Sequence, residues 1–340
     1  MRPFVAFARF FPMVLALALL PAGPSAAQQE TQQQRAQSQP YNNAPTWRDV
    51  RSGKEEYTSI KGRETGVLVQ TYGETWRQLK NGWITPIAGW VIAAVALVIG
   101  AFYWWRGSIK VHGAATGRLI QRFTPFERYV HWVVAISFCV LGVTGLIIML
   151  GKYVLLPVIG YTLFGWLTQL SKHLHNFAGP VFILGLLAFI VMFIKDNLPR
   201  LHDLGWLVKA GGMISGEHVP SGKFNAGEKL WFWGGVVVLS LIVSASGLVL
   251  DFPNFDQVRA VMIEANLVHA AAAGAVMAIS LGHIYLGSIG LEGAYDAMRY
   301  GYVDEAWAKE HHEYWYNDIK SGKIKAGAAT GLPVAPQAQH

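Results

Sequence analysis

Five long stretches of this chain contain no charged side chain, and they constrain the fold more than any other feature. They are residues 81–105, 129–151, 173–194, 230–250 and 265–291. A membrane-spanning helix needs about 20 consecutive apolar residues, so each stretch is long enough to cross a bilayer. Only 14% of the residues are charged, against about 25% in a typical soluble domain. The sequence therefore predicts an all-α membrane protein built as a transmembrane helix bundle.

A sixth uncharged stretch, residues 153–171, is also long enough to span, although Pro157 and Gly160 interrupt it. Cytoplasmic loops of membrane proteins are enriched in Lys and Arg, and this bias decides the number of spans. With five spans, residues 106–128, residues 195–229 and the C-terminal tail fall on the cation-rich side. A sixth span would move the five cations of residues 195–229 to the opposite side. We therefore expect residues 153–171 to lie at the membrane interface.

Residues 1–27 have the pattern of a secretory signal peptide, with an uncleaved anchor helix as the alternative. Two arginines precede an apolar run, and the small residues that follow suit cleavage after Ala27. Residues 28–45 are rich in glutamine and too polar to form a core, so we expect them to be disordered. Short apolar runs between glycines then predict a strand or two within the N-terminal region 28–80, which we interpret as a docking surface for a partner.

The signal peptide and the charge bias predict the same orientation in a bacterial inner membrane. Export places the mature N-terminus in the periplasm, and the cation-rich side, with the tail 292–340, lies in the cytoplasm. The span 81–105 then runs inward and precedes a four-helix core, residues 106–291. The net charge of +7 lies mostly in these cytoplasmic segments, which argues for membrane topology and against a nucleic-acid-binding surface.

The last span contains two histidines, His269 and His283, which are unusual in a lipid-facing helix. They are 14 positions apart. That separation is a rotation of about 1400°, about 40° short of four full turns, so they project from nearly the same face. The rise between them is about 21 Å, which places one near each surface of a hydrocarbon core about 30 Å thick. Ionisable residues inside a membrane are candidates for function.

Two other spans supply histidines at matching depths. His131 begins the second span at its cytoplasmic end, level with His283. His175 begins the third span at its periplasmic end, level with His269, and the less deeply placed His173 is an alternative to it. Neutral imidazole binds haem iron, so two bis-imidazole haem sites are the simplest interpretation.

Other residue types agree with haem that is held without a covalent bond. With Cys139 as the only cysteine, the chain cannot hold a Cys-ligated iron–sulfur cluster or attach haem through Cys-x-x-Cys-His. Zinc suits the pattern less well, because four histidines at two levels do not form one tetrahedral site. Small residues near the histidines would leave room for a porphyrin, although helix packing also favours small residues. They are Gly142, Gly145, Gly179, Ala273, Gly274 and Gly287.

Together, these segments resemble the gamma subunit of respiratory membrane-bound formate dehydrogenases, a di-haem cytochrome b. The resemblance covers residues 118–320, and the loop Gly222–Lys229 is its most specific part. The matching segments are Arg122–Trp132, Leu174–Gly179, Gly222–Lys229, Leu267–Ala272, Gly282–Tyr285 and Trp307–His312. The histidines alone also fit b-type cytochromes of hydrogenases and of other oxidoreductases. The span 81–105 lies outside the family's four-helix core and is expected to be an extra N-terminal span.

The resemblance implies two b haems, with His131 and His283 as the iron ligands of one and His175 and His269 as those of the other. It implies that the chain is not an enzyme by itself but the membrane-anchor subunit of a complex. A catalytic (alpha) subunit would oxidise formate, and an iron–sulfur (beta) subunit would deliver the electrons at the periplasmic side.

The resemblance also implies a quinone site beside the cytoplasmic haem, near Asn225, Gly227 and His283. An amide can donate a hydrogen bond to a quinone carbonyl, and glycine permits close backbone approach. The cytoplasm would supply the protons for quinol. The remaining alternative, a transporter that uses the histidines as a proton relay, would need intramembrane carboxylates, and the spans contain none.

Overall fold

The computed structural model describes most of the chain from residue 71 onward. The described residues are 47–48, 51–52, 56–57, 59, 67–69, 71–212, 215–255 and 257–324. The expected signal peptide (1–27), the glutamine-rich stretch (28–45) and the last part of the tail lie outside these ranges. Within them, helices predominate, and the short strands form two two-stranded sheets.

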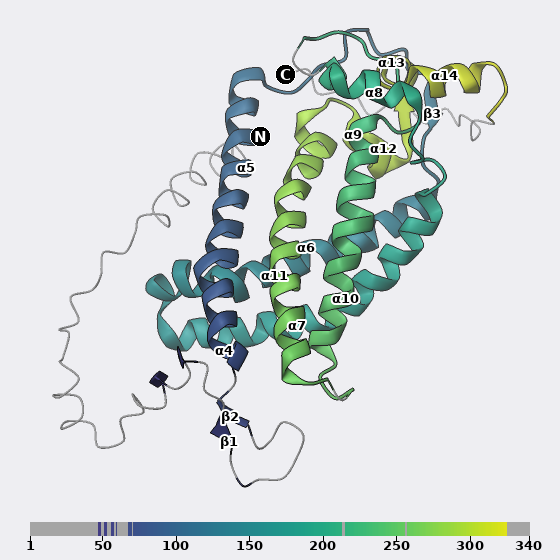
Figure 1. The fold of residues 1–340 in the computed structure, drawn as a ribbon. Helices are drawn as coiled ribbons and strands as arrows, with labels where there is room; N and C mark the ends of the chain where they lie inside the picture. The colour runs from purple at the N-terminus through teal and green to yellow at the C-terminus, as the bar shows by residue number, and fades with distance from the viewer. Residues whose placement is uncertain are drawn as a thin grey trace.

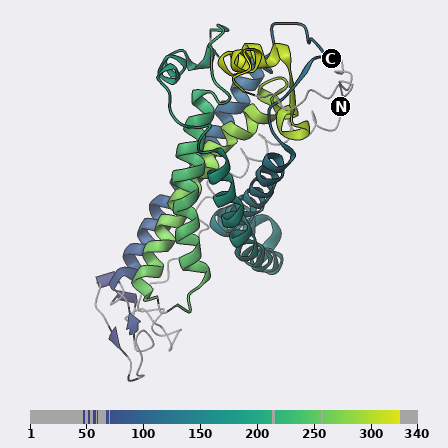
Figure 2. The ribbon, with the colours of Figure 1, turned by 90° about the vertical axis from the view of Figure 1, so that its right-hand side faces the viewer.

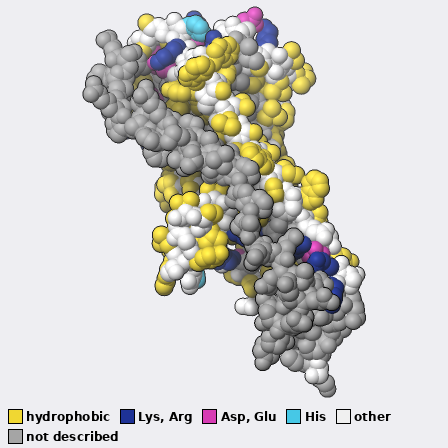
Figure 3. Space-filling view, turned by 90° about the vertical axis from the view of Figure 1, so that its left-hand side faces the viewer, with side chains coloured by type: hydrophobic (Ala, Val, Ile, Leu, Met, Phe, Trp, Pro, Cys, Tyr) yellow, Lys and Arg dark blue, Asp and Glu magenta, His cyan; other side chains and the backbone are white. Residues whose placement is uncertain are grey.

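Within the described residues, five helices are long and apolar enough to cross a membrane. They are Tyr72–Arg106, Pro125–Val154, Leu156–Phe193, Ala226–Asp251 and Arg259–Gly290. Each predicted span coincides with one of these helices, but the first helix begins at Tyr72 rather than at residue 81, and the third begins at Leu156 rather than at residue 173. The prediction of an all-α transmembrane bundle is therefore confirmed. Figure 3 agrees with it, because apolar side chains cover much of the visible flank of the bundle.

The first membrane helix consists of three consecutive elements. They are α4 (Thr71–Arg77), the π-helical η1 (Gln78–Ile84) and α5 (Thr85–Arg106). Before it, β1 (Glu56–Tyr57) pairs antiparallel with β2 (Val67–Val69), which confirms the expected strand or two in this region.

The second membrane helix, α6 (Pro125–Val154), begins where the sequence Thr-Pro-Phe-Glu dictates. The Thr124 hydroxyl accepts a hydrogen bond from the backbone N–H of Glu127 at 3.2 Å, and the Glu127 carboxylate accepts one from that of Thr124 at 2.6 Å. This capping box satisfies two backbone donors that the first turn leaves unpaired, and proline suits the first helical position. The start of α6 fixes His131 near this end of the helix.

The third membrane helix, α7 (Leu156–Phe193), includes much of the stretch expected at the interface. Gly160 bends the helix near its start, with φ 76° and ψ 172°. Residues other than glycine rarely adopt this backbone conformation. After the bend the helix continues through His175 to Phe193 without a second break in conformation. Residues 156–171 are therefore helical and continuous with the span, while their place at the membrane interface stays a prediction.

The last two membrane helices are also built from several elements. The fourth contains α9 (Ala226–Leu230), the π-helical η3 (Trp231–Leu239) and α10 (Ser240–Asp251). The fifth contains α11 (Arg259–Tyr285) and the π-helical η4 (Leu286–Gly290).

Helix α11 lies between α5 and α10 and packs against both (Figure 1). Helices α6 and α7 pack along each other as a hairpin, which has far fewer contacts with the other three helices. Figure 2 shows this hairpin diverging from α5, α10 and α11. The bundle is thus two packed groups of helices rather than one evenly packed cylinder.

A cap closes the end of the bundle at which α6 begins. It contains β3 (Leu119–Gln121), α8 (Leu201–Val208), the 3-10 helix η2 (Ala210–Gly212), α12 (Ala294–Tyr300), β4 (Tyr302–Asp304), α13 (Glu305–His311) and α14 (Glu313–Lys320). Strand β3 pairs antiparallel with β4, with Ile120 opposite Val303. Phe123, Trp307 and Trp315 form part of the buried core beneath this sheet.

Arg122 and Glu305 are among the charged side chains buried in and beside the cap. Arg122 lies against the rings of Phe123 and Trp307, with its guanidinium 5.1 Å from the centre of each, and donates to Glu228 at 3.0 Å. Glu305 is buried and accepts hydrogen bonds from Tyr316 at 2.6 Å and from Arg118. Its partners, of which Tyr316 contributes most, hold the pKa of the Glu305 carboxyl at about 2. Ion pairs and the packing of the Arg122 guanidinium on aromatic rings therefore hold the elements of the cap together and join them to α9.

The contact between α5 and α11 depends on two small residues. A Cβ atom added at Gly274 would lie 2.6 Å from the Cβ of Ala88, closer than carbon atoms approach without displacement. At the start of the same interface, the Trp76 indole donates to the Asn266 side chain at 3.0 Å. The extra span is therefore packed into the bundle through a close backbone approach.

We expect Gly274→Ala to destabilise the protein by about 1–3 kcal/mol, because overpacking must separate α5 from α11. Gly100→Ala in α5 is the matched control, since a Cβ there has nothing within 4 Å. Thermal unfolding of the detergent-solubilised protein should show a lower Tm for the Gly274 variant alone. Equal Tm values for the two variants would contradict the proposed contact.

Candidate functional site

The structure brings the four intramembrane histidines together as two pairs. The ring centres of His175 and His269 are 6.1 Å apart, and those of His131 and His283 are 6.4 Å apart. These are the pairs expected from their depths in the spans. Each pair takes one ring from the α6–α7 hairpin and the other from α11.

The spacing within each pair fits a metal ion ligated by both rings. With metal–nitrogen bonds of about 2.0–2.1 Å and ring atoms about 1.1 Å from the ring centre, two imidazoles on one ion have centres about 6.3 Å apart. Rings in van der Waals contact could lie much closer. Among the described residues, no group of three or more His, Cys, Asp or Glu side chains could hold a metal ion. The two-ring arrangement therefore fits an ion that carries its other ligands with it, as haem iron does.

Hydrogen bonds orient both rings of the first pair. The Thr144 hydroxyl donates to the Val140 carbonyl at 2.7 Å, so its oxygen can accept from Nδ1 of His175 at 2.9 Å. The Val243 carbonyl accepts from Nδ1 of His269 at 3.0 Å. A carbonyl can only accept, so Nδ1 carries the proton and Nε2 keeps its lone pair for a ligand.

Glycines make room beside the same two rings. A Cβ at Gly145 would lie 3.5 Å from Cε1 of His175, as expected from its position on the histidine face of α6. A Cβ at Gly247 would lie 3.1 Å from Cε1 of His269, a tight contact. The sequence reasoning missed Gly247, as well as Thr144 and the Ser246 hydroxyl that lies 3.3 Å from Nδ1 of His269. The hydroxyls of Thr144 and Ser246, which lie inside apolar runs, were the sequence signal that could have indicated these contacts.

The other predicted small residues have different surroundings. Gly274 packs against Ala88 of α5, so helix packing explains it and a porphyrin face does not. A Cβ at Gly142 would meet the Met277 sulfur at 4.0 Å, whereas Gly179 and Gly287 have nothing within 4 Å. The packing alternative thus holds for Gly274, while Gly179 and Gly287 border open space.

Aromatic rings surround the second pair. Trp231 of η3 stacks on His283, with ring centres 5.0 Å apart and an interplanar angle of 14°. Phe189 of α7 lies 6.2 Å from His131, whose Nδ1 is buried without a hydrogen-bond partner in the described part of the chain. A buried nitrogen without a hydrogen-bond partner costs free energy, so we expect the His131 ring to interact with a further group outside the described residues. Sequence reasoning missed this stacking.

His173 does not belong to either pair. It is exposed, whereas His175 is half-buried and faces His269. Of the two alternatives left open by the sequence, the geometry therefore favours His175.

A large cavity of about 1830 Å³ extends from the second pair into the cap. His131 and His283 line it, together with Asn225 and Gly227, so the expected quinone-site residues share one space. Single small-molecule sites are typically about 300–1,000 Å³. The cavity is thus large enough for more than one ligand, and apolar and aromatic side chains form much of its wall.

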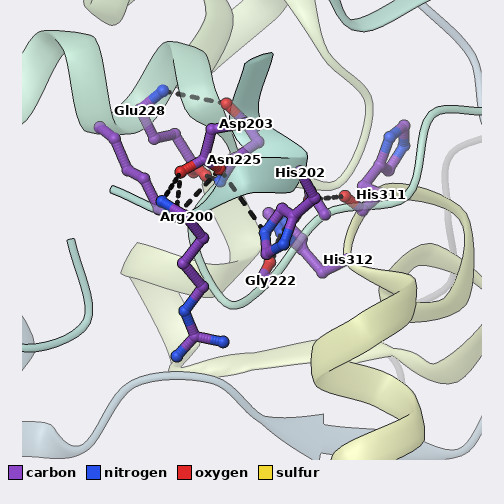
Figure 4. Close-up of polar contacts among 10 residues, drawn as sticks. Arg200, His202, Asp203, Gly222, Asn225, Glu228, His311 and His312 are labelled. Carbon is purple, nitrogen blue, oxygen red and sulfur yellow. Dashed lines mark hydrogen bonds and ion pairs between the residues drawn. The ribbon is translucent and has the colours of Figure 1, made fainter. Parts of the chain in front are cut away.

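Asn225 begins α9 and points its side chain at that helix. Its Oδ1 accepts from the Glu228 backbone N–H at 2.9 Å, and the Glu228 carboxylate accepts from the Asn225 backbone N–H at 2.8 Å. This capping box occupies the amide oxygen and leaves the amide nitrogen as a donor. Figure 4 shows Asn225 and Glu228 beside Asp203 of α8.

Gly227 permits a close approach by a side chain of the neighbouring helix α8. A Cβ there would lie 3.0 Å from the Trp206 ring of α8. Next to it, Lys229 donates to Asp203 at 2.7 Å in a buried ion pair. The absent side chain lets Trp206 pack against α9, and both Gly227 and Trp206 line the cavity, so the part of Gly227 in a quinone site stays a prediction.

Comparison with known proteins assigns the chain to a family. Residues 122–299 match the prokaryotic cytochrome b561 family. The cytochrome b556(fdo) subunit of formate dehydrogenase from Escherichia coli (strain K12) is 31% identical over 207 residues, which cover 59% of this chain and 93% of the relative. The nitrate-inducible cytochrome b556(Fdn) subunit of the same strain is 27% identical over 226 residues, 63% of this chain and 98% of the relative.

A third relative extends this likeness beyond one organism. The cytochrome b556 subunit of formate dehydrogenase from Haemophilus influenzae is 26% identical over 229 residues, 64% of this chain and 90% of the relative. The family match begins at Arg122, so it includes both histidine pairs and leaves α5 outside.

The cytochrome b561 family implies a b-type haem, which fits the geometry of the histidine pairs. Its members are electron-transfer subunits rather than catalytic ones, as predicted for this chain. Five apolar helices and this likeness together confirm a multi-pass membrane protein. The chain therefore belongs to the prokaryotic cytochrome b561 family of membrane cytochromes, and the cytochrome b subunits of formate dehydrogenase are its relatives.

Proposed function

We propose that this chain is the di-haem cytochrome b subunit of a membrane-bound formate dehydrogenase and delivers electrons to membrane quinone. The observation that carries the proposal is the pair of two-histidine sites, with ring centres 6.1 and 6.4 Å apart. When bound, a haem at each site would supply a carrier that accepts and releases one electron at a time. The formate dehydrogenase relatives support the identity of the complex.

The charge bias supports the orientation of the two sites. The cation-rich loops and tail favour a cytoplasmic position, at the bacterial inner membrane, for the cap and with it for His131 and His283. His175 and His269 then lie near the periplasm, where an iron–sulfur (beta) subunit would dock. Each electron that moves inward works against the field by about 2.3 kcal/mol per 100 mV, so the complex would help to build the membrane potential.

The residues around each site have distinct tasks in this proposal. Thr144 and the Val243 carbonyl hold the periplasmic rings in the tautomer that ligates iron. Trp231 holds the His283 ring by stacking and limits the access of water to it. The Asn225 amide nitrogen donates a hydrogen bond to a quinone carbonyl, while the apolar wall of the cavity accommodates the quinone ring. Formate oxidation belongs to the catalytic (alpha) subunit.

The direct test of the proposed function uses the complex purified from membranes with its partner subunits. Formate should reduce b-type absorption in the complex, and an added short-chain quinone should reoxidise it. Co-purification of an iron–sulfur subunit is the second expectation. A complex whose haem responds to hydrogen or another donor but not to formate would refute the assignment.

Single histidine variants should separate the two haems. His175→Ala and His283→Ala should each retain about half of the haem of the wild type, because one ligand of a different pair is removed. Haem content and a redox titration measure the loss, and each variant should lack a different component. His173→Ala is the control and should retain both haems. If both variants lost the same component, the pairing would be wrong.

Asn225→Asp should weaken quinone binding and leave haem content unchanged. Aspartate is as good a helix cap as asparagine, so α9 keeps its start, but the amide donor is lost. One hydrogen bond contributes about 1 kcal/mol, so the KM for quinone should rise by about five- to tenfold. Asn317→Asp, on the exposed face of α14, is the control. Unchanged quinone kinetics in the Asn225 variant would rule out this contact.

A further inference from the structure

The wall of the cavity within the cap contains a run of four ionisable residues, Glu310–Glu313, with the sequence Glu-His-His-Glu. The run joins α13 to α14 and has no part in holding haem. Asn225 and His283 line the same cavity. A single space therefore connects titratable side chains of the cap with the proposed quinone site.

The two glutamates of this run each pair with a histidine from another segment. The Glu310 carboxylate lies 2.8 Å from Nδ1 of His112, and the Glu313 carboxylate lies 2.7 Å from Nε2 of His218. The His112 side chain is 75% exposed and that of His218 42% exposed, so both pairs reach solvent. Each pair therefore joins an imidazole in contact with solvent to a carboxylate in the wall of the cavity.

The two histidines of the run have opposite environments. His312 is fully buried, and its Nδ1 lies 2.7 Å from the Gly222 carbonyl, so its proton is held in a fixed hydrogen bond. His311 is half-buried against Trp307, and its Nε2 is buried without a hydrogen-bond partner among the described residues. Figure 4 shows the His312 ring turned toward Gly222 and the His311 ring pointing away from it. Only His311 can gain or lose a proton at a buried nitrogen without breaking a bond to the protein.

The electrostatic surroundings of His311 are mixed. Burial lowers the pKa of the ring below its ordinary value of 6.5, so it is neutral at pH 7 and accepts a proton as the pH falls. The nearby carboxylates oppose this effect and the nearby cations add to it. The charged and titratable groups that face the ring are Arg122 after β3, His218 in the loop before α9, Glu228 in α9, and Glu310 and His312 in the run itself.

We propose that His311 relays protons from the two solvent-exposed His–Glu pairs to the quinone bound beside Asn225. Reduction of quinone to quinol consumes two electrons and two protons and converts two carbonyl oxygens into hydroxyls. The proposed electron transfer supplies the electrons, and the cytoplasm supplies the protons. In each step the His311 imidazolium releases a proton through cavity water to a quinone oxygen, and the neutral ring is then reprotonated from the His–Glu pairs.

This inference rests on the proposed function, and its test distinguishes the two. The experiment uses the whole complex with formate and a short-chain quinone, in wild type and in His311→Gln. Quinone reduction should fall by about tenfold or more at pH 7.5, since a positioned proton carrier typically contributes 10²–10⁴-fold. Formate-dependent reduction of b-type absorption, and haem content, should stay at wild-type levels. The wild-type rate should rise as the pH falls, and the variant should lose this rise.

His202→Gln is the matched control. His202 is also half-buried and lies against Tyr314, with ring centres 5.0 Å apart and an interplanar angle of 58°. Its buried Nε2 has no hydrogen-bond partner in the described part of the chain, although the Asp203 carboxylate lies 3.6 Å from it. Unlike His311, it does not line the cavity. Its replacement should leave the rate and pH profile of quinone reduction unchanged.

A second variant, His311→Ala, separates proton relay from a structural role. Added imidazole should restore quinone reduction in this variant, increasingly as the pH falls and more imidazolium is present. A wild-type rate in both His311 variants would overturn the relay while leaving the proposed function intact. A slow His311→Ala complex that imidazole does not rescue would also overturn it. A wild-type complex that reduces no quinone would refute the proposed function and the relay together.

Discussion

The two pairs of imidazoles inside an apolar bundle are the arrangement on which the rest of the structure depends. Each pair joins one ring from the α6–α7 hairpin to one from α11, and the hairpin otherwise touches the remaining helices at few points. A ligand that binds both rings of a pair would therefore join the two groups of helices. The family's haem would in this way stabilise the bundle in addition to carrying electrons.

Different contacts orient the imidazole rings at the two sites. Near His175 and His269, the helix that faces each ring provides a hydrogen-bond acceptor for Nδ1, so the tautomer is fixed before any ligand arrives. Near His283, stacking on Trp231 fixes the plane of the ring and leaves its proton unassigned. The second site also opens into the cavity of the cap. Rigid, closed surroundings suit a site that only passes electrons, and an open cavity suits one that meets a diffusing substrate and protons.

The sequence predicted much of the fold and the identity of the paired histidines, and its failures have a common cause. Apolar runs and charge bias predicted the membrane helices, and the 14-residue spacing in α11 predicted two levels. For Gly274 the sequence left haem and helix packing open, because its neighbour Ala88 comes from the extra span, whose packing partner no local pattern reveals. Gly247 and Ser246 were missed, because α10 contributes no histidine and therefore carried no signal of its own.

The sequence by itself predicted the number of apolar spans and the position of each histidine along its span, because these depend on hydrophobicity and helical rise along one segment. The tertiary structure alone decided which small residues face an imidazole, which hydroxyls and carbonyls fix its tautomer, and that Trp206 fills the space beside Gly227. It also brought Glu310–Glu313 into the cavity that reaches Asn225. Such contacts depend on the rotation and crossing of helices far apart in the chain. Packing between side chains sets these angles, and no single segment encodes them.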